Sequence, residues 1–211
     1  MEELDISKLI TNNVTNISWM FCECDQLKKL NVSNFNTSKV ISMTQMFSGC
    51  RSLKELNVSN FNTKRVKYMN HMFQGCSSLK ELDLSNFNND HVIDMKDMFA
   101  ACLSLEKINI NNFNTKKVKN MYCMFNDCQS LKELNLSHFI TDNVTDMSFM
   151  LDKCSSLIKL DISNFKVTDE TKLGYIFNGC SSLKELKCLD PKIKKEYGNF
   201  LDKLSSSNQE N

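Results

Sequence analysis

Hydrophobic and polar residues follow one another along this chain in a pattern that returns every 26 residues. Leucine, valine, methionine and phenylalanine positions keep this step from Leu4 to Leu186 without an insertion or a deletion. A fixed period of this length predicts a stack of similar units, each of which buries its apolar face against its neighbours. The cysteines that mark the period are Cys24, Cys50, Cys76, Cys102, Cys128, Cys154 and Cys180.

Each unit divides into a strand and a second apolar segment. The strand comes from Leu-x-x-Leu-x-Leu, whose alternation places two side chains in the core. Eight such strands, from Leu4–Ile6 to Leu186–Cys188, are expected to form a parallel sheet. Behind each strand, apolar residues recur at the spacing of one helical face, which predicts a short helix or helical turn. One example of this second segment is Val40, Met43, Met46, Phe47 and Cys50.

These elements predict an α/β repeat protein, a leucine-rich-repeat solenoid with one short parallel strand and one short helix or helical turn per 26-residue repeat. Residues 1–188 would form seven to eight repeats. Pro191 suits a helix start, and Ile193, Tyr197 and Phe200 share one helical face, so residues 189–204 are expected to be a C-terminal capping helix. The polar residues 205–211 are expected to be a disordered tail.

The N-terminal end has no comparable cap. Only Met1 to Glu3 precede the first strand, so the first repeat is expected to present a bare apolar face and an open strand edge. Two interpretations remain open. Either two copies of the chain meet there as a homodimer, or the chain is the C-terminal piece of a longer protein.

Composition excludes several classes of protein. The 211 residues carry a formal net charge of +1, and no stacking aromatics interleave with the lysines, which argues against nucleic-acid binding. No apolar run approaches the ~18 residues that membrane insertion requires. Only 5 glycines and 1 proline exclude a collagen-like chain. The start lacks a secretory signal, so a cytoplasmic location is expected from this chain alone.

The periodic cysteines are expected to be buried free thiols that pack as small hydrophobic residues. Identical side chains that point the same way are unsuited to disulfides, and the lone Cys22-Glu23-Cys24 is not a metal-binding pattern. Outside the period, Cys188 falls in a core strand position. Cys123 falls on the outward face of the second segment, where an exposed thiol is expected.

No catalytic, metal or cofactor site follows from the pattern. The histidines His71, His91 and His138 occupy different positions of the repeat and make no metal spacing or Ser-His-Asp arrangement. A glycine-rich phosphate loop is also missing from the sequence. Since function must be argued from a site, we expect that the protein is not an enzyme and binds no cofactor.

Two surface columns are candidates for binding. Outward strand positions are small, polar and nearly free of aromatics, which favours a solvated face and leaves only a weak case for peptide or glycan binding. On the opposite side, one position changes in every repeat and includes three aromatics; partner binding and relaxed constraint explain it equally well. Its candidate partner-binding residues are Trp19, Gln45, His71, Asp97, Phe149 and Tyr175, and Cys123 belongs to the same column.

The segment Met72–Phe87 reads Met-Phe-x-x-Cys-x-Ser-Leu-Lys-x-Leu-x-Leu-Ser-x-Phe. This unit resembles the repeats of the BspA-like leucine-rich-repeat surface proteins, and the resemblance extends from about Leu4 to Cys188. The resemblance implies a right-handed solenoid that holds no cofactor and binds partners rather than catalysing a reaction. It also implies a cell-surface or host-contact role.

The sequence therefore predicts a non-enzymatic protein-binding scaffold with a protein partner. Two alternatives stay open. The first is a fragment of a BspA-like adhesin, which would place the protein at the cell surface. The second is a self-associating structural module that joins through its uncapped N-terminal repeat.

Overall fold

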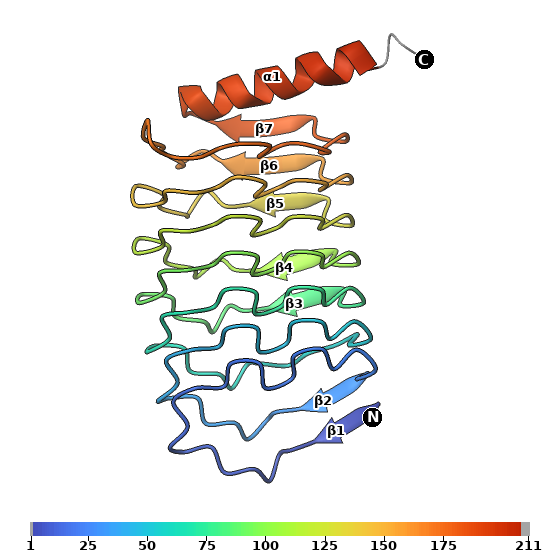
Figure 1. Ribbon diagram of the computed structural model, residues 1–211, viewed down its shortest axis with the longest axis vertical. Coiled ribbons are helices and arrows are strands. Elements are labelled where there is room, and N and C mark those ends of the chain that lie inside the picture. The colour runs from blue at the N-terminus through green and yellow to red at the C-terminus, as the bar shows by residue number, and fades with distance from the viewer. Residues whose placement is uncertain (1, 208–211) are drawn as a thin grey trace.

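The computed structural model describes residues 2–207 as a stack of coils with the N-terminus at one end and one long helix across the other (Figure 1). Each coil is one 26-residue repeat, and equivalent residues of neighbouring coils lie side by side. The predicted leucine-rich-repeat solenoid is confirmed. Its elements are β1 (Glu3–Asp5), β2 (Lys29–Asn31), β3 (Glu81–Asp83), β4 (Lys107–Asn109), β5 (Glu133–Asn135), β6 (Lys159–Ile162), β7 (Glu185–Cys188) and α1 (Pro191–Ser207).

The strands pair in parallel and in the expected register, with Leu82 beside Ile108 and Leu160 beside Leu186. They form three short sheets, β1-β2, β3-β4 and β5-β6-β7. The prediction of a strand at Leu56–Val58 is wrong, because residues 53–58 form no strand. Glu55 and Glu81 are equivalent residues of adjacent coils, and like charges placed side by side disfavour pairing between these two coils. Pairing is also missing between β2 and residues 53–58 and between β4 and β5, where the neighbouring charges are opposite.

The second segment of each repeat is built from turns rather than a helix; within residues 2–207, α1 is the only helix. Gln45 and Gly49 have left-handed backbones, with φ of 54° and 75°, which an α-helix does not allow. Alternate N–H groups instead donate to the next coil, as from Gln45 to the Asn70 carbonyl at 3.0 Å. Of the two predicted forms, the structure therefore has the turn.

The core is made of columns in which each residue stacks on its own equivalent. Five phenylalanine rings lie 5.2–5.7 Å apart in one such column. A parallel column of methionines is fully buried beside them. Because every coil has the same kinds of core side chain at the same positions, the same packing arrangement repeats along the whole stack. The stacked rings are Phe21, Phe47, Phe73, Phe99 and Phe125.

The prediction of buried structural thiols is confirmed for six of the periodic cysteines. All ten cysteines are free, and the six are at most 1% exposed. Each of these thiols donates to the backbone carbonyl 29 residues earlier, at 3.1–3.2 Å. Burial raises the pKa of Cys102 to about 12. The six are Cys50, Cys76, Cys102, Cys128, Cys154 and Cys180, whereas Cys24 in the first coil is only partly buried.

Helix α1 closes the C-terminal end of the stack (Figure 1). Asp190 caps its start, since one carboxylate oxygen accepts the N–H of Lys192 at 2.9 Å and of Ile193 at 3.2 Å. Ile193 is fully buried, and the Tyr197 ring packs edge-on against Phe177 at 5.4 Å.

The observed bounds of α1 differ from the predicted cap. It begins at residue 191 rather than 189 and includes residues 205–207 of the predicted tail; the remaining residues 208–211 lie outside the described residues. No helix between residues 2 and 207 is both long enough and apolar enough to cross a bilayer.

One buried polar column is interrupted at Asn89. In neighbouring coils the Thr37 hydroxyl donates to the Asn62 carbonyl at 3.0 Å and accepts the Asn62 N–H at 2.7 Å, and Thr63 bonds Asn88 in the same way. Asn89 occupies the equivalent position and is 1% exposed. Its amide nitrogen and oxygen have no hydrogen-bond partner among the described residues.

Asn89→Thr should therefore raise the free energy of unfolding, by about 1–2 kcal/mol, because the hydroxyl would restore the pair of bonds and remove two unsatisfied buried atoms. Urea unfolding followed by circular dichroism measures the change. The reverse exchange at the neighbouring site, Thr63→Asn, should lower stability by a similar amount. A less stable Asn89→Thr protein would contradict this explanation.

Candidate functional site

The predicted partner-binding column lies on a tight turn in every repeat. All of its residues, Cys123 included, have φ between 53° and 60°. The structure places them in one row, with the Phe149 and Tyr175 rings stacked at 5.0 Å and the Trp19 indole donating to Gln45. Only the ends of the row are open: Trp19 is 58% and Tyr175 59% exposed, whereas Asp97 is buried.

The prediction of an exposed Cys123 thiol is wrong, since the residue is 8% exposed. Asp97 of the preceding coil and the adjacent Tyr122 lie against it. Burial, followed by the charge of Asp97, raises the pKa of Cys123 to about 11. A thiol so difficult to deprotonate is a poor nucleophile near neutral pH.

The same row holds a histidine and a buried carboxylate, but in an order unsuited to catalysis. The His71 Nδ1 lies 3.0 Å from the Gln74 amide oxygen and 3.7 Å from the Asp97 carboxylate. Burial raises the pKa of Asp97, while the charges of His71 and Lys96 oppose the increase. The carboxylate lies between the histidine and Cys123, so the imidazole is not placed to take the thiol proton. In this cluster His71 and Lys96 lie close to the buried Asp97 carboxylate and offset its charge.

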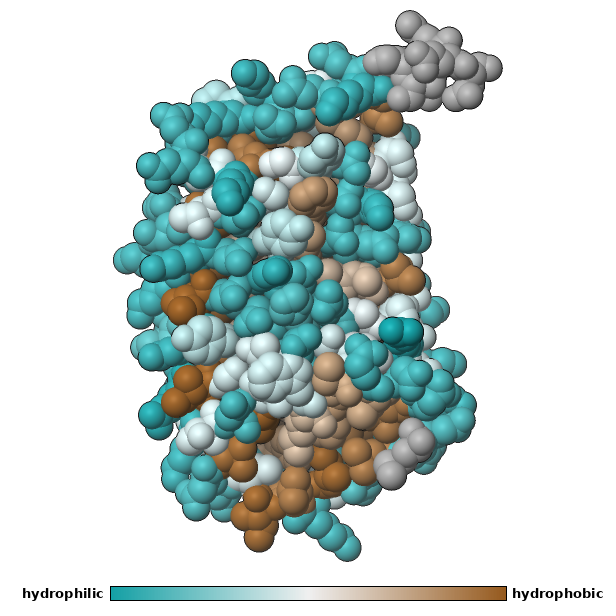
Figure 2. All heavy atoms as spheres, viewed as in Figure 1, coloured by the Kyte–Doolittle hydropathy of each residue, from teal (hydrophilic) through white to brown (hydrophobic). Residues whose placement is uncertain are grey.

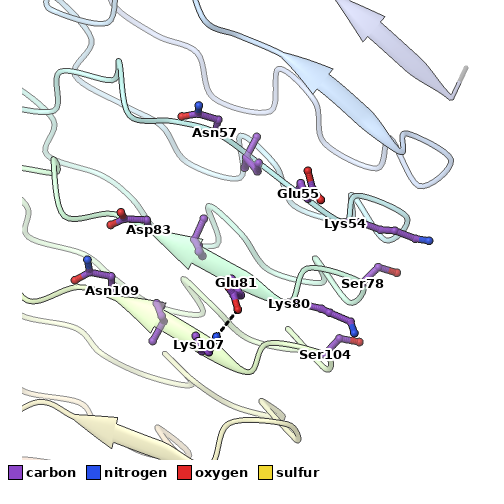
Figure 3. Close-up of a pocket in the computed structure, with 13 residues that line it drawn as sticks. Lys54, Glu55, Asn57, Ser78, Lys80, Glu81, Asp83, Ser104, Lys107 and Asn109 are labelled. Atoms are coloured by element: carbon purple, nitrogen blue, oxygen red, sulfur yellow. Dashed lines mark hydrogen bonds and ion pairs between the residues drawn. The ribbon is translucent and has the colours of Figure 1, made fainter.

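A hollow of about 1060 Å³ opens on the strand face, between residues 54–57, β3 and β4 (Figure 3). We call it the strand-face hollow. Lys54 and Lys80 lie along one side, toward the start of the strands, and Asn57, Asp83 and Asn109 lie along the other (Figure 3). Between these polar sides the lining includes Leu56 and Ile108, which are partly buried, and Leu82, which is only 3% exposed. A smaller hollow of about 260 Å³ lies over β5, β6 and β7.

Ion pairs run down the strand face beside this hollow. One column of equivalent positions contains the pairs Glu3–Lys29 at 2.8 Å and Glu81–Lys107 at 2.6 Å. Further along, Lys159 bridges two glutamates. Within residues 2–207, Glu55 is the one member of this column without an ion pair. The column consists of Glu3, Lys29, Glu55, Glu81, Lys107, Glu133, Lys159 and Glu185.

The acidic and amide side chains on the far side of the hollow already have a structural role. The Asp83 carboxylate accepts the Ser85 N–H at 2.9 Å, and the Asn57 amide oxygen accepts the Ser59 N–H at 3.0 Å. These bonds form the turn that ends each strand segment. The Ser85 N–H also lowers the pKa of Asp83.

Sequence reasoning favoured a solvated strand face, with only a weak case for peptide or glycan binding, and missed this hollow. A signal was nevertheless present. Glu55 and Glu81 are the only adjacent members of the ion-pair column that have the same charge. This pair marks one place where strand pairing is lost; pairing is also lost between β4 and β5, where Lys107 and Glu133 have opposite charges.

The exposed apolar face predicted for the N-terminal repeat is present. Figure 2 shows hydrophobic side chains gathered at the end of the stack that holds the first coil. Ile10 is 81% exposed, and Leu9 and Met20 are also exposed. Exposed patches of this kind mark interaction surfaces more often than isolated apolar side chains do.

Comparison with known proteins agrees with this architecture. The sequence family described as "Mycoplasma protein of unknown function, DUF285" matches residues 1–108 and again residues 79–190. No curated protein sequence matches the chain.

The fold is also found in a solved leucine-rich-repeat structure. The leucine-rich-repeat protein TpLRR of T. pallidum superposes with a TM-score of 0.54 and 20% identity, over 94% of this chain and 76% of that one. A leucine-rich-repeat protein from Bacteroides ovatus has a TM-score of 0.47 and 19% identity, over 89% of this chain and 61% of its own. A leucine-rich cell-surface protein from Faecalibacterium prausnitzii has a TM-score of 0.36 and 14% identity, over 89% and 79%.

Proposed function

Because the chain belongs to the DUF285 family and folds as a leucine-rich-repeat solenoid of the BspA-like type, we propose that it is a non-enzymatic protein-binding scaffold. The observation that carries the proposal is the strand-face hollow. Its volume of about 1060 Å³ is at the upper end of small-molecule sites, and its polar side chains around the partly exposed Leu56 and Ile108 suit a short stretch of polypeptide. A stack held by parallel columns of core residues supplies a rigid frame for such a site.

Peptides selected from a displayed random library against the full chain should bind in the strand-face hollow. Asn57→Arg places a large side chain in the hollow and should weaken their binding by about tenfold or more. Asn135→Arg is the matched control, since Asn135 is the equivalent residue beside the smaller hollow and makes the same turn bond to Ser137. Fluorescence anisotropy measures both affinities. Equal binding by the two variants would show that the hollow is not the site.

The Trp19–Tyr175 column is a second candidate surface. The stacked Phe149 and Tyr175 rings support it, because aromatic side chains are frequent anchors at protein interfaces. The same selected peptides distinguish the two surfaces. If they lose affinity for a Phe149→Ala, Tyr175→Ala protein and keep it for Asn57→Arg, the column is the binding site.

Self-association is the alternative function that the exposed N-terminal end supports. The C-terminal end is covered by α1, so a second copy would meet the first through their two N-terminal ends. Wild-type protein should then dimerise with rising concentration, and Ile10→Lys should remain monomeric in light scattering. Ile140→Lys, at another exposed isoleucine, is the control. A wild-type protein that is monomeric at every concentration would exclude this function.

A cell-surface location is the part of the proposal that depends on the BspA-like repeat. The periodic cysteines are compatible with an oxidising environment, since six of them are shielded from oxidants by burial. Antibody labelling of intact cells tests the location. Labelling that appears only after the cells are permeabilised would contradict it.

A further inference from the structure

Three departures from the repeat coincide at one coil. Residues 53–58 form no strand, Glu55 lacks an ion pair within the described chain, and the strand-face hollow opens at the same place. In most coils equivalent positions reproduce one another closely, as the thiol column shows, although the threonine column is interrupted at Asn89 and β4 does not pair with β5. A coil that differs from its neighbours in backbone, charge and shape presents a surface that the other coils lack. Such a surface is a candidate binding site.

The backbone of this coil offers unused hydrogen-bonding groups. Between residues 2 and 207, no backbone hydrogen bond involves Lys54, Glu55, Leu56 or Asn57 through its N–H or carbonyl group. One coil later the backbone is paired: the Lys80 carbonyl, equivalent to that of Lys54, accepts the Glu106 N–H at 2.8 Å, and residues 81–83 pair with β4. Free backbone N–H and carbonyl groups are groups with which the backbone of an extended peptide can pair.

The charges around the hollow indicate which kind of peptide it would bind. Glu81 is neutralised by Lys107, and Asp83 is engaged with the Ser85 N–H. Glu55 and Lys54 have neither an ion pair nor a side-chain hydrogen bond among the described residues. Glu55 lies between Asn57 and Lys54 along its coil, whereas Lys54 points away from the hollow at the side (Figure 3). Of these two unmatched charges, the one that does not point away from the hollow is therefore negative.

We propose that the strand-face hollow takes an extended peptide segment whose lysine or arginine side chain pairs with Glu55, an inference that rests on the proposed function. The apolar stem of the basic residue packs against the partly exposed Leu56, and its cation reaches the carboxylate. The peptide backbone meets the open N–H and carbonyl groups of residues 54–57. Charge complementarity at this position selects the class of partner, a basic segment, and the backbone contacts hold it extended.

The test uses the full chain and peptides selected from a displayed library. Selected sequences should share a lysine or arginine at one fixed position. Glu55→Gln, which keeps the shape of the side chain, should weaken their binding by about tenfold, and replacement of the basic residue by glutamine in the peptide should cause the same loss. The two changes together should cost little more than either alone, because they remove the same pair. Glu133→Gln is the control, since Glu133 is in the same column and already pairs with Lys159 at 3.5 Å.

The outcomes separate this inference from the proposed function. Peptides that lose affinity for Asn57→Arg but bind Glu55→Gln as tightly as wild type would leave the peptide site in place and overturn the basic anchor. Selected peptides without a shared basic residue would also overturn it. Peptides unaffected by Asn57→Arg would remove the site itself.

Discussion

Raising the pH to about 10–11 should unfold the solenoid. The cause is the column of buried thiols. Burial raises the pKa of Cys50, Cys102 and Cys180 to about 12, and it raises those of Cys76, Cys128 and Cys154 as well. In the unfolded chain these thiols ionise near their ordinary value of 9.

The direction follows from proton linkage. Between these two pKa values the folded thiols keep protons that the unfolded thiols release, so the free energy of unfolding falls as pH rises. The stabilisation is complete below pH ~9 and is lost progressively toward pH ~12. Each thiol contributes a slope of about 1.4 kcal/mol per pH unit, and the six together about 8 kcal/mol per unit. Since whole domains are stable by only about 5–15 kcal/mol, one or two pH units should suffice.

Urea unfolding at a series of pH values measures this slope. Cys102→Ala should lower stability at neutral pH, because it removes a buried side chain and the bond to the Phe73 carbonyl, and should also reduce the slope by about one sixth. Val118→Ala, another truncation of a fully buried residue, should lower stability and leave the slope unchanged. An unaltered slope in Cys102→Ala would mean that the thiols do not control alkaline stability.

Phe99→Ala should cost about 3–5 kcal/mol, the second large effect. The ring is fully buried and stacks between Phe73 at 5.7 Å and Phe125 at 5.2 Å. Its removal leaves a cavity in the middle of a one-dimensional stack, where each coil is held only by its neighbours. Denaturant unfolding should therefore show a lower midpoint, and hydrogen exchange should show the loss of protection centred on that coil.

The chain contains its own control for this prediction. Leu151 occupies the same column between Phe125 and Phe177 and is 1% exposed, so the column accepts leucine. Phe99→Leu should accordingly cost only about 1–1.5 kcal/mol. If leucine cost as much as alanine at this position, ring stacking rather than filled volume would hold the column together.

Particular residues show how much of the structure could be predicted from the sequence. The period of 26 residues was enough to predict the parallel register that places Leu82 beside Ile108, and to predict that Cys102 is a buried free thiol. It also predicted the apolar N-terminal end that Ile10 exposes. These properties follow directly from repetition, because identical units stacked in register place each residue against its own equivalent.

Other features were decided only by contacts between coils. The spacing of Val40, Met43, Met46 and Phe47 fits a helix and a pair of turns equally well, and the inter-coil bond from Gln45 to Asn70, with its left-handed backbone, decides for turns. Cys123 is buried because Asp97 of the preceding coil covers it.

The candidate binding site divides in the same way. The adjacent glutamates Glu55 and Glu81 are visible in the sequence, but the hollow and the unbonded backbone of residues 54–57 are not. A repeat pattern fixes which side chains face inward, since that depends on local spacing alone. Whether neighbouring backbones close on one another depends on charge and packing between residues 26 positions apart, and only the folded stack brings those residues together.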